Sequence, residues 1–514
     1  MSIFAEERSY YPAIITANVI LATFLAVCSA ITTLIADSAI QGELALSDTD
    51  AIWLTTLYLL GINLTVPTGD WFANRFGFNQ MYTYGIIFFV CGSLLAALAQ
   101  NFWMIASARF IEGVGAGFIF PVGLSLIIKN LPKSRIALGI NLYIAGAFGG
   151  GIGLGLPLSG YFTQFQSWRM LFFLIAFGGS LAGAACWHTK PSHSQQSKTP
   201  FDVLGLITFA LFVSTLLIAL TLGPIPATDA GWRTPYIIAF FVIAVLSLFA
   251  CIFVENRHPD PLIPMPLFKD PIFSVSLAAM FLLGMATFAS VATSVQYMLN
   301  GLLYEKFITG QTSSIYGIVI AIFSIIASYL VRYIPLPILT FVGLSCLSFS
   351  YFYNNELSFL TGADQVIPIL TIRGIGIGLS LGPTTILALY GVPHELKSAA
   401  ATILTFFRQV GATYGGTLIS IFSIRQTIFH AARFGEQANT QLPGYKMTFH
   451  NLYNKYPDAA QAKAAIVKSI LNQAYIQGLN DALIVFGYVT GIVGAILAIL
   501  ISIRMWKNRK RIRS

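Results

Sequence analysis

The chain has 514 residues, of which 56% are hydrophobic and only 10% are charged, and its mean hydropathy is +0.75. A soluble globular domain carries about 25% charged residues, so this composition excludes a soluble protein and is typical of a membrane protein with many spans. The net charge of +9 does not indicate a nucleic-acid-binding protein, because the basic residues fall between apolar segments and in the C-terminal tail.

Apolar stretches recur along almost the whole chain. A helix needs about 20 residues to cross a hydrocarbon core about 30 Å thick, and most of these stretches have that length. We therefore predict an all-α polytopic membrane protein with about fourteen transmembrane helices. In chain order the predicted spans are residues 13–35, 51–68, 80–100, 104–128, 137–159, 168–187, 203–223, 235–254, 272–298, 314–334, 336–353, 364–391, 399–424 and 481–503.

The distribution of basic residues predicts the orientation in the membrane. The first span is too long for a cleavable signal peptide, so we expect it to remain in the protein. If the N-terminus is cytoplasmic, the outer loops 37–50 and 354–364 are acidic or neutral, and the inner loops are basic, as the positive-inside rule requires. We therefore expect a multi-pass plasma-membrane protein (inner membrane in a Gram-negative cell) with both termini in the cytoplasm. The inner basic residues are Arg75, Lys129, Lys133, Arg135, Lys190, Lys198, Arg257, Lys269, Lys397 and six between Arg504 and Arg513.

The fourth predicted span contains two opposite charges, Arg109 and Glu112. A charge at membrane depth costs roughly 2.5 to 3.5 kcal/mol even on insertion scales, so such residues usually mark a polar cavity or an ion path. Three residues of separation place both side chains on one helical face, close enough to pair. Two interpretations stay open: a structural ion pair that neutralises itself, or a site where Glu112 exchanges a proton with an affinity set by burial and by the neighbouring cation.

The sequence contains two similar halves. Arg109 is followed by Gly113, Gly115, Gly117 and Pro121, and Arg373 is followed by Gly374, Gly376, Gly378 and Pro383. Gly146, Gly149 and Gly150 have counterparts in Gly411, Gly415 and Gly416, and both pairs of motifs are separated by about 262 to 266 residues. Parallel six-helix repeats around a midplane site are a transporter architecture. We predict an N-terminal six-helix half (residues 1–192), a central two-helix insert (193–260) and a C-terminal six-helix half (261–514).

Few other charged residues lie inside the predicted spans. Five isolated cysteines and six histidines in loops or at span ends do not form a metal-ligand pattern, and the glycine runs lack the Gly-Lys-Ser/Thr ending of a phosphate-binding loop. We therefore expect no metal, no cofactor and no ATP site. Further candidates for coupling or for a cavity are Arg373 and Arg408, and weaker candidates for the substrate cavity are Asn63, Gln296, Tyr297 and Gln409.

Several motifs in sequence order resemble a known family. Arg109 to Gly117 resembles the fourth-helix motif of the major facilitator superfamily, and residues 67–77, with Arg75 and Gly77, resemble its loop between the second and third helices. Residues 155–173 are similar to the antiporter motif, and residues 201–268 to the central insert of fourteen-helix drug:proton antiporters. Arg408, Gln409, Gly411 and Gly415 match the thirteenth helix of that family. The resemblance implies a transporter and not an enzyme.

The chain departs from this family's pattern at positions that bear on coupling. Asn74 stands where the loop motif has an acidic residue, and Ser29 where the first helix usually has an aspartate. Glu112 stands where the family usually has a neutral amide, so we expect it to supply the protonatable group that is missing elsewhere. In the fifth span the Gly-Pro pair is spread to Gly155 and Pro157, which shifts the expected bend by one position.

The segment near residues 425–480 is expected to face outward. Apolar residues between Ile466 and Ala474 recur with helical spacing, which predicts a short amphipathic helix on the membrane surface or over a cavity mouth. Docking of a periplasmic adaptor protein, as in some relatives, is the alternative. The basic tail after Arg504 follows the last span.

The function that these observations favour is export of small amphipathic molecules by proton antiport and alternating access. The expected partners are a small-molecule substrate, protons and the lipid bilayer. A proton-coupled importer and a dedicated exporter of one metabolite, such as a siderophore, remain alternatives. A membrane enzyme or lipid-handling protein is the alternative of another class, but it requires clustered Asp, His or Cys at a membrane face, and the sequence shows no such cluster.

Overall fold

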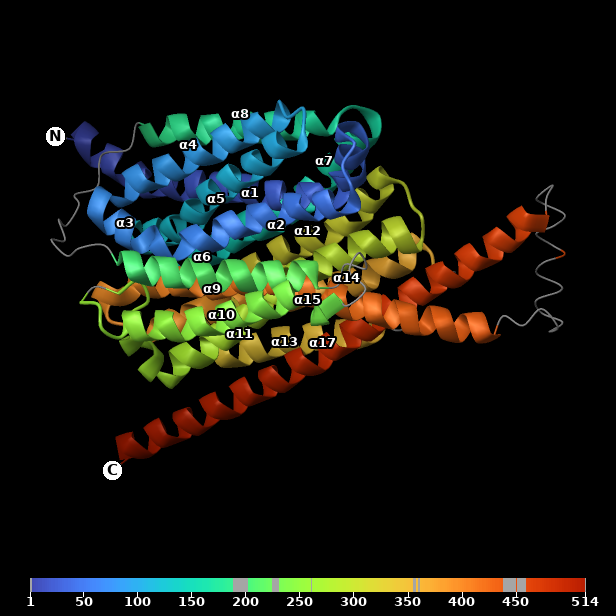
Figure 1. Ribbon diagram of the computed structural model, residues 1–514. Helices are drawn as coiled ribbons and strands as arrows, with labels where there is room; N and C mark the ends of the chain where they lie inside the picture. The colour runs from blue at the N-terminus through green and yellow to red at the C-terminus, as the bar shows by residue number, and fades with distance from the viewer. Residues whose placement is uncertain are drawn as a thin grey trace.

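A computed structural model describes the chain as a bundle of long helices with no strand among the described residues (Figure 1). The N- and C-termini lie at the same end of the bundle, which we call the termini end; the opposite end is the far end. The described residues are 2–187, 202–223, 231–259, 261–354, 357–358, 361–437, 450 and 459–513.

The N-terminal half contains the first six predicted spans. The second and fifth spans are each built from more than one helical segment: α2 continues through a 3-10 turn into α3, and α6 continues through the π-helical turn η3 into α7. The elements are α1 (Ser2–Leu44), α2 (Asp48–Thr65), η1 (Val66–Thr68), α3 (Gly69–Phe76), α4 (Phe78–Ala97), α5 (Phe102–Asn130), α6 (Ile136–Ile144), η3 (Ala145–Gly150), α7 (Gly151–Phe165) and α8 (Trp168–Trp187).

The insert and the C-terminal half supply the remaining eight spans. The two insert helices pack on each other, and α9 also contacts α2 and α15. The elements are α9 (Val203–Leu222), α10 (Pro235–Glu255), α11 (Pro271–Gln296), η6 (Tyr297–Gly301), α12 (Lys306–Leu330), α13 (Leu336–Tyr353), α14 (Ala363–Tyr390), α15 (Lys397–Gln437) and α17 (Ala459–Arg513).

The all-α fold is confirmed, and helices are present at all fourteen predicted spans. Within the described residues, thirteen helices are long and apolar enough to cross a membrane. The thirteenth predicted span, in α15, is outside this set and contains the polar residues Arg408 and Gln409. α12 begins at Lys306, eight residues before the predicted start at 314, and α1, α15 and α17 extend beyond their predicted spans.

Short polar residues and one glycine define several helix boundaries. The Ser47 side chain accepts a hydrogen bond from Asp50 N, and the Asp50 carboxylate accepts one from Ser47 N, which forms a capping box at the start of α2. Asn101 caps α5 by accepting a hydrogen bond from Met104 N. Gly77, between α3 and α4, has a φ of 100°, which glycine adopts without the strain that a side chain would cause.

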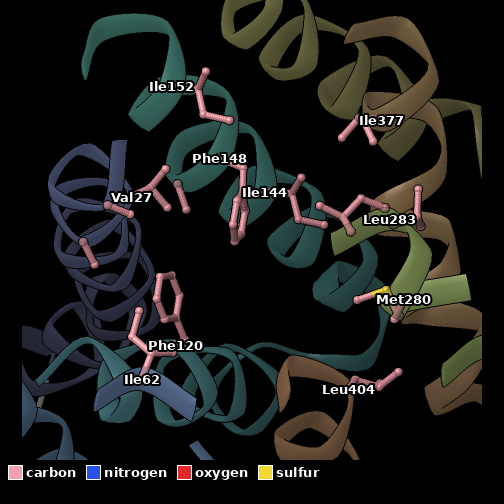
Figure 2. Packing of buried hydrophobic residues seen from close by; sticks show 14 of the residues in the cluster. Val27, Ile62, Phe120, Ile144, Phe148, Ile152, Met280, Leu283, Ile377 and Leu404 are labelled. Atoms are coloured by element: carbon pink, nitrogen blue, oxygen red, sulfur yellow. The ribbon is translucent and has the colours of Figure 1, made fainter. Parts of the chain in front are cut away.

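The two halves share one apolar core. Phe120 and Phe148 of the N-terminal half lie across from Met280, Leu283 and Leu404 of the C-terminal half (Figure 2). The halves are therefore packed together along the middle of the bundle.

Small residues bring α7 and α12 into backbone contact along the seam between the halves. A Cβ on Gly317 would lie 2.2 Å from Gly153 N, and one on Gly149 would lie 2.5 Å from Ala321 N. Without side chains at these positions, the helix backbones pack directly on each other, as is typical of helix pairs in membranes. The glycine-rich fifth span therefore packs closely against α12.

The halves also touch at both ends of the seam. At the termini end, Ser398 Oγ of α15 donates a hydrogen bond to Ser125 Oγ of α5, 3.1 Å away. At the far end, Gln164 of α7 accepts from Phe307 N at 2.8 Å and donates to Glu305 Oε2 at 2.7 Å. The two halves are therefore hydrogen-bonded to each other at both ends of the seam.

The segment 425–480 differs from the expected loop with a separate short helix. α15 continues to Gln437, and residues 459–480 are the beginning of α17, which runs on without interruption into the last span. The predicted amphipathic helix is present, but it is the first part of α17 and not a short element of its own, because no proline breaks the helical pattern between 459 and 503. The two helix ends project from the far end of the bundle (Figure 1). Residues 438–449 and 451–458 lie outside the described residues.

Gly317→Ala tests the backbone contact between the halves. The added Cβ meets Gly153 N at 2.2 Å and Gly149 O at 2.7 Å, and neither backbone atom can turn away. We expect a loss of about 1–3 kcal/mol in stability, as for other overpacked sites, and a lower melting temperature of the purified protein. Gly416→Ala is the matched control, because nothing lies within 4 Å of its added Cβ. Equal melting temperatures for the two variants would contradict the close approach of α7 and α12.

Candidate functional site

Arg109 and Glu112 form a fully buried ion pair one helical turn apart on α5. Arg109 Nη1 lies 2.5 Å from Glu112 Oε2, and both side chains have 0% exposure. The pairing expected from their spacing is therefore present in the folded chain. Because an isolated charge is costly in this environment, each side chain offsets the charge of the other.

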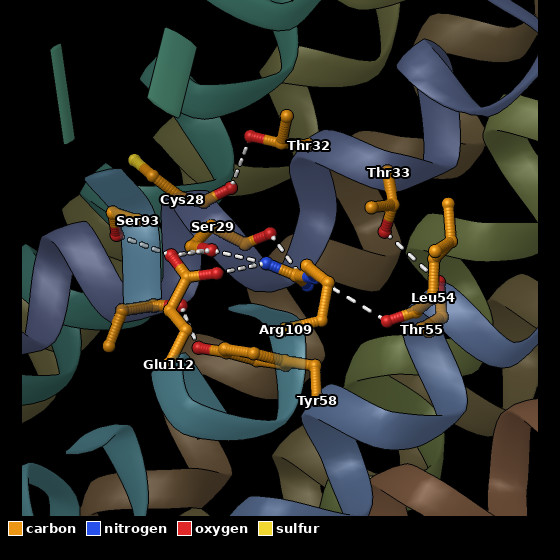
Figure 3. Close-up of polar contacts among 11 residues, drawn as sticks. Cys28, Ser29, Thr32, Thr33, Leu54, Thr55, Tyr58, Ser93, Arg109 and Glu112 are labelled. Atoms are coloured by element: carbon orange, nitrogen blue, oxygen red, sulfur yellow. Dashed lines mark hydrogen bonds and ion pairs between the residues drawn. The ribbon is translucent and has the colours of Figure 1, made fainter. Parts of the chain in front are cut away.

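Two serines from neighbouring helices complete the surroundings of the Glu112 carboxylate (Figure 3). Ser29 Oγ of α1 and Ser93 Oγ of α4 each donate a hydrogen bond to Glu112 Oε1 at 2.6 Å. With Arg109 on Oε2, both oxygens are occupied, and three helices meet at one carboxylate. Protonation of Glu112 would change all of these contacts together.

Arg109 joins the same site to α2. Its Nη1 also donates to Ser29 Oγ at 2.7 Å, and its Nε donates to Leu54 O at 3.4 Å. The guanidinium carbon lies 4.1 Å from the centre of the Tyr58 ring, within the range of a cation–π contact (Figure 3). Arg109 therefore keeps several neutral partners besides Glu112.

Glycines let α2 and α4 approach this part of α5. A Cβ on Gly92 would lie 2.4 Å from Glu112 N, and one on Gly113 would lie 2.2 Å from Tyr58 O. The motif glycine Gly113 thus places α2 directly against α5. Close packing at Gly92 and Gly113 brings Ser93 and Tyr58 to the two charges.

The equivalent arginine of the C-terminal half, Arg373, has no carboxylate partner among the described residues. Its side chain is 1% exposed, and it donates to Asn354 Oδ1 at 3.1 Å and to Ser350 Oγ at 3.4 Å. Its guanidinium lies 4.8 Å from the Tyr351 ring centre. The repeat offset of 264 residues between the two arginines places Gly376 where Glu112 stands, so the C-terminal half lacks the acid of the N-terminal half.

A small cavity, about the size of one water molecule, lies beside Arg373. The weak candidate Tyr297 lines it and donates a hydrogen bond to Ser358 O at 3.0 Å. Gln296, the residue before it, is partly buried and does not line this cavity. The structure therefore joins Tyr297 to Arg373 and leaves Gln296 apart from both arginine sites.

Arg408 and Gln409 lie between the two halves. The Arg408 guanidinium carbon is 4.1 Å from the ring centre of Phe148 on η3, and two small cavities border the side chain. Asn63 of α2 donates a hydrogen bond to Thr413 Oγ1 of α15 at 2.7 Å, one turn after Gln409. Four of the predicted polar candidates thus lie in two places. Arg373 lies within the C-terminal half, whereas Asn63, Arg408 and Gln409 lie along the seam.

The loop-motif residues are helical in the structure. Asn74 donates to Asp70 Oδ2 at 3.1 Å, one turn earlier in α3, and Asp70 also interacts electrostatically with Lys129 at the end of α5. An acid is therefore present one turn away from the position where the family motif has one. Arg75 is exposed in the last turn of α3, where a positive charge is favourable for the helix dipole.

The fifth span is irregular before Pro157, at the π-helical turn η3. The side chain of Cys28, next to Ser29 on α1, donates a weak hydrogen bond to Gly151 O at 3.3 Å, at the end of this turn. A Cβ on Gly155 would lie 3.1 Å from Cys28 Sγ. The irregular turn is thus held against the same helix that contacts Glu112.

Sequence reasoning missed Ser93, Tyr58 and Phe148. A single serine, tyrosine or phenylalanine in an apolar span has no distinctive spacing, and its role is visible only once the helices are packed. The available signal was indirect: Ser93 follows Gly92, and Phe148 lies within a run of glycines.

Comparison with known proteins identifies the family. The sequence model of the Major Facilitator Superfamily matches residues 19–203 and 202–416. The chain belongs to the major facilitator superfamily. It is therefore an integral, multi-pass secondary transporter and not an enzyme, as the sequence predicted.

Curated relatives span nearly the whole chain. It is 23% identical over 474 residues to the multidrug export protein EmrB of Escherichia coli strain K12, with 91% of each chain covered. It is 24% identical over 500 residues to an uncharacterized MFS-type transporter, YhcA, of Bacillus subtilis strain 168, covering 95% of this chain and 92% of the relative. The multidrug resistance protein Stp of Mycobacterium tuberculosis is 25% identical over 387 residues, covering 73% of this chain and 69% of Stp.

Solved structures share the fold. The proton:xylose symporter XylE, bound to 6-bromo-6-deoxy-D-glucose, matches with a TM-score of 0.59 at 12% identity, covering 97% of this chain and 96% of XylE. A POT family transporter in complex with 5-aminolevulinic acid matches with a TM-score of 0.59 at 15% identity, covering 94% and 95%. At these identities the likeness concerns the arrangement of helices alone.

A double-mutant cycle measures the coupling between Arg109 and Glu112. Arg109→Gln and Glu112→Gln each leave one buried charge without its opposite, whereas the double variant removes both charges. We expect the double variant to be more stable than the sum of the two single losses predicts, with a coupling of about 1–3 kcal/mol. Thermal melts of the purified proteins measure it. Additive losses would show that the contact contributes nothing to the fold.

Proposed function

We propose that this protein exports small amphipathic molecules in exchange for protons, with Glu112 as the proton-binding group. The observation that supports this proposal most strongly is the Glu112 carboxylate, buried at 0% exposure and hydrogen-bonded by Ser29, Ser93 and Arg109 from three helices. Buried carboxylates in membrane bundles commonly belong to proton relays. Multidrug export is the activity named for EmrB, and it supports the direction of transport.

The surroundings of Glu112 permit two protonation states. When Glu112 binds a proton, Arg109 loses its ionic partner but keeps Ser29 Oγ, Leu54 O and the Tyr58 ring. The neutral carboxyl keeps hydrogen bonding to Ser29 and Ser93, because a hydroxyl both donates and accepts. Proton binding therefore changes the contacts between α1, α4 and α5 without leaving the cation isolated.

A continuous set of contacts leads from Glu112 to the seam. Ser29 bonds to Glu112, and its neighbour Cys28 bonds to Gly151 O at the end of η3. η3 carries Phe148, whose ring stacks on Arg408 in the other half. A substrate beside Arg408 would displace Phe148, and this displacement would reach Ser29 through α1. The coupling is then mutual: substrate binding weakens proton binding, and proton binding weakens substrate binding.

The membrane supplies enough energy for this exchange. With the termini end in the cytoplasm, as the basic loops predict, each proton that moves inward down 100 mV releases about 2.3 kcal/mol. This free energy corresponds to roughly fifty-fold accumulation of a neutral substrate outside. Alternating access requires the contacts at the two ends of the seam to open in turn, Ser125 with Ser398 at one end and Gln164 with Phe307 at the other.

Proteoliposomes with an imposed proton gradient test the proposed antiport. Internal pH is followed while cationic dyes, neutral drugs, organic anions and siderophores are added in turn. We expect one class of compound to make protons cross the membrane in the direction opposite to the compound. Glu112→Gln should reduce this proton movement at least tenfold. Asp364→Asn, which removes an exposed carboxylate in the first turn of α14, is the control and should retain wild-type exchange.

Other outcomes of this experiment would contradict the proposal. Proton movement in the same direction as the compound would establish symport and an importer. Normal coupling in Glu112→Gln would exclude Glu112 as the proton site. If Glu112→Gln does not fold, Ser93→Ala keeps the carboxylate and removes one of its hydrogen-bond partners, so the pH profile of exchange should change.

A disulfide between the halves tests alternating access. The hydroxyls of Ser125 and Ser398 are 3.1 Å apart, so cysteines at both positions bring two sulfur atoms close to bonding distance. We expect oxidation of the Ser125→Cys, Ser398→Cys double variant to reduce transport in proportion to the cross-linked fraction, with recovery after reduction. The single variants are the controls. Full transport by fully cross-linked protein would mean that this end does not open.

A further inference from the structure

The seam between the halves carries a buried positive charge. Arg408 belongs to α15 of the C-terminal half and is 5% exposed, and its guanidinium faces Phe148 and Phe120 of the N-terminal half at 4.1 and 5.6 Å. Its Nη1 has no hydrogen-bond partner among the described residues, while the side chain also interacts with the Tyr143 hydroxyl of α6. The cation thus crosses the seam with part of its donor capacity unused.

No acidic residue lines the two small cavities beside this guanidinium. Both cavities include Phe148, Leu381 and Arg408 in their walls, and Arg408 is the one charged residue that contributes to either lining. The other lining residues are apolar or carry hydroxyl or amide groups, among them Tyr143, Met280, Phe288 and Gln409. The Arg408 guanidinium is therefore the one charged group in a largely apolar, aromatic lining.

This arrangement differs from the Arg109 site, where Glu112 neutralises the charge within the same helix turn. A buried guanidinium without a counter-charge favours any anionic group that reaches it, because the resulting hydrogen bonds are charge-assisted and can be bidentate. The same charge repels a cationic ligand, and the low dielectric of the seam strengthens both effects.

We propose that the substrate is an amphipathic organic anion. Its carboxylate or sulfonate binds Arg408 at Nη1, the nitrogen without a partner, and its apolar body packs against Phe148, Met280 and Phe288. The cavities enlarge to hold it when one end of the seam opens. This inference rests on the proposed transport function and specifies its substrate class.

The proposal has an electrical consequence. When a monovalent anion leaves the cell and a proton enters, both movements carry positive charge inward. Export is then electrogenic and is driven by membrane potential even without a pH difference. Exchange of a monovalent cation for one proton, in contrast, moves no net charge.

A pair of ions with the same shape and opposite charge tests the substrate class. Tetraphenylborate and tetraphenylphosphonium differ little in size, and their saturable binding to purified full-length protein is measured by equilibrium dialysis, with protein-free micelles subtracted. We expect the borate to bind at least tenfold more tightly than the phosphonium. Arg408→Gln should abolish this preference, and Arg408→Lys should retain part of it. Arg332→Gln, which removes an exposed arginine after α12, should leave the preference unchanged.

The wild-type comparison decides the proposal even if Arg408→Gln does not fold. The proposal would be overturned if the phosphonium bound as tightly as the borate or more tightly. It would also be overturned if neither tetraphenylborate nor a second organic anion, 1-anilinonaphthalene-8-sulfonate, showed saturable binding. Retention of the preference in a folded Arg408→Gln variant would also overturn the role of Arg408. Failure of the proton antiport is distinguishable, because selective anion binding would persist in a protein that moves no protons.

Discussion

The cost of placing charge inside a membrane-spanning bundle determines the arrangement of this protein's polar residues. Arg109 and Glu112 stabilise each other at 2.5 Å, and Ser29 and Ser93 occupy the remaining carboxylate oxygen. Their helices can come this close because Gly92 and Gly113 carry no side chains. Under the proposed mechanism, the contacts that stabilise the ionised pair come from three helices. Protonation of the pair therefore changes the contacts between those helices.

The two halves of the chain use one motif for different purposes. Both carry an arginine followed by glycines, but the N-terminal half has Glu112 where the C-terminal half has Gly376. The N-terminal half therefore holds an acid beside its arginine, whereas Arg373 relies on Asn354, Ser350 and the Tyr351 ring. The proposed division places the proton in one half and the substrate's charge on Arg408, at the seam with the other.

Much of the fold was predictable because its signals are local. Span length, hydropathy and the repeated glycine motifs depend on neighbouring residues, and they gave all fourteen helices. The helix predicted near 466–474 is present as part of α17. Local periodicity could not show that it continues into the last span. The pairing of Arg109 with Glu112 followed from helical spacing. Ser93, Tyr58 and Phe148 could not be predicted, because their roles depend on which helices are neighbours.

The central claim is that Glu112 changes protonation when substrate binds. Infrared difference spectroscopy of the purified protein in lipid measures this directly, because a protonated carboxyl group has a band separate from that of a carboxylate. The account predicts that substrate added to protein poised with Glu112 protonated removes one carboxyl band, and that this change is absent in Glu112→Gln. An identical difference spectrum in wild type and Glu112→Gln would contradict it and would leave Arg109 and Glu112 as a structural ion pair.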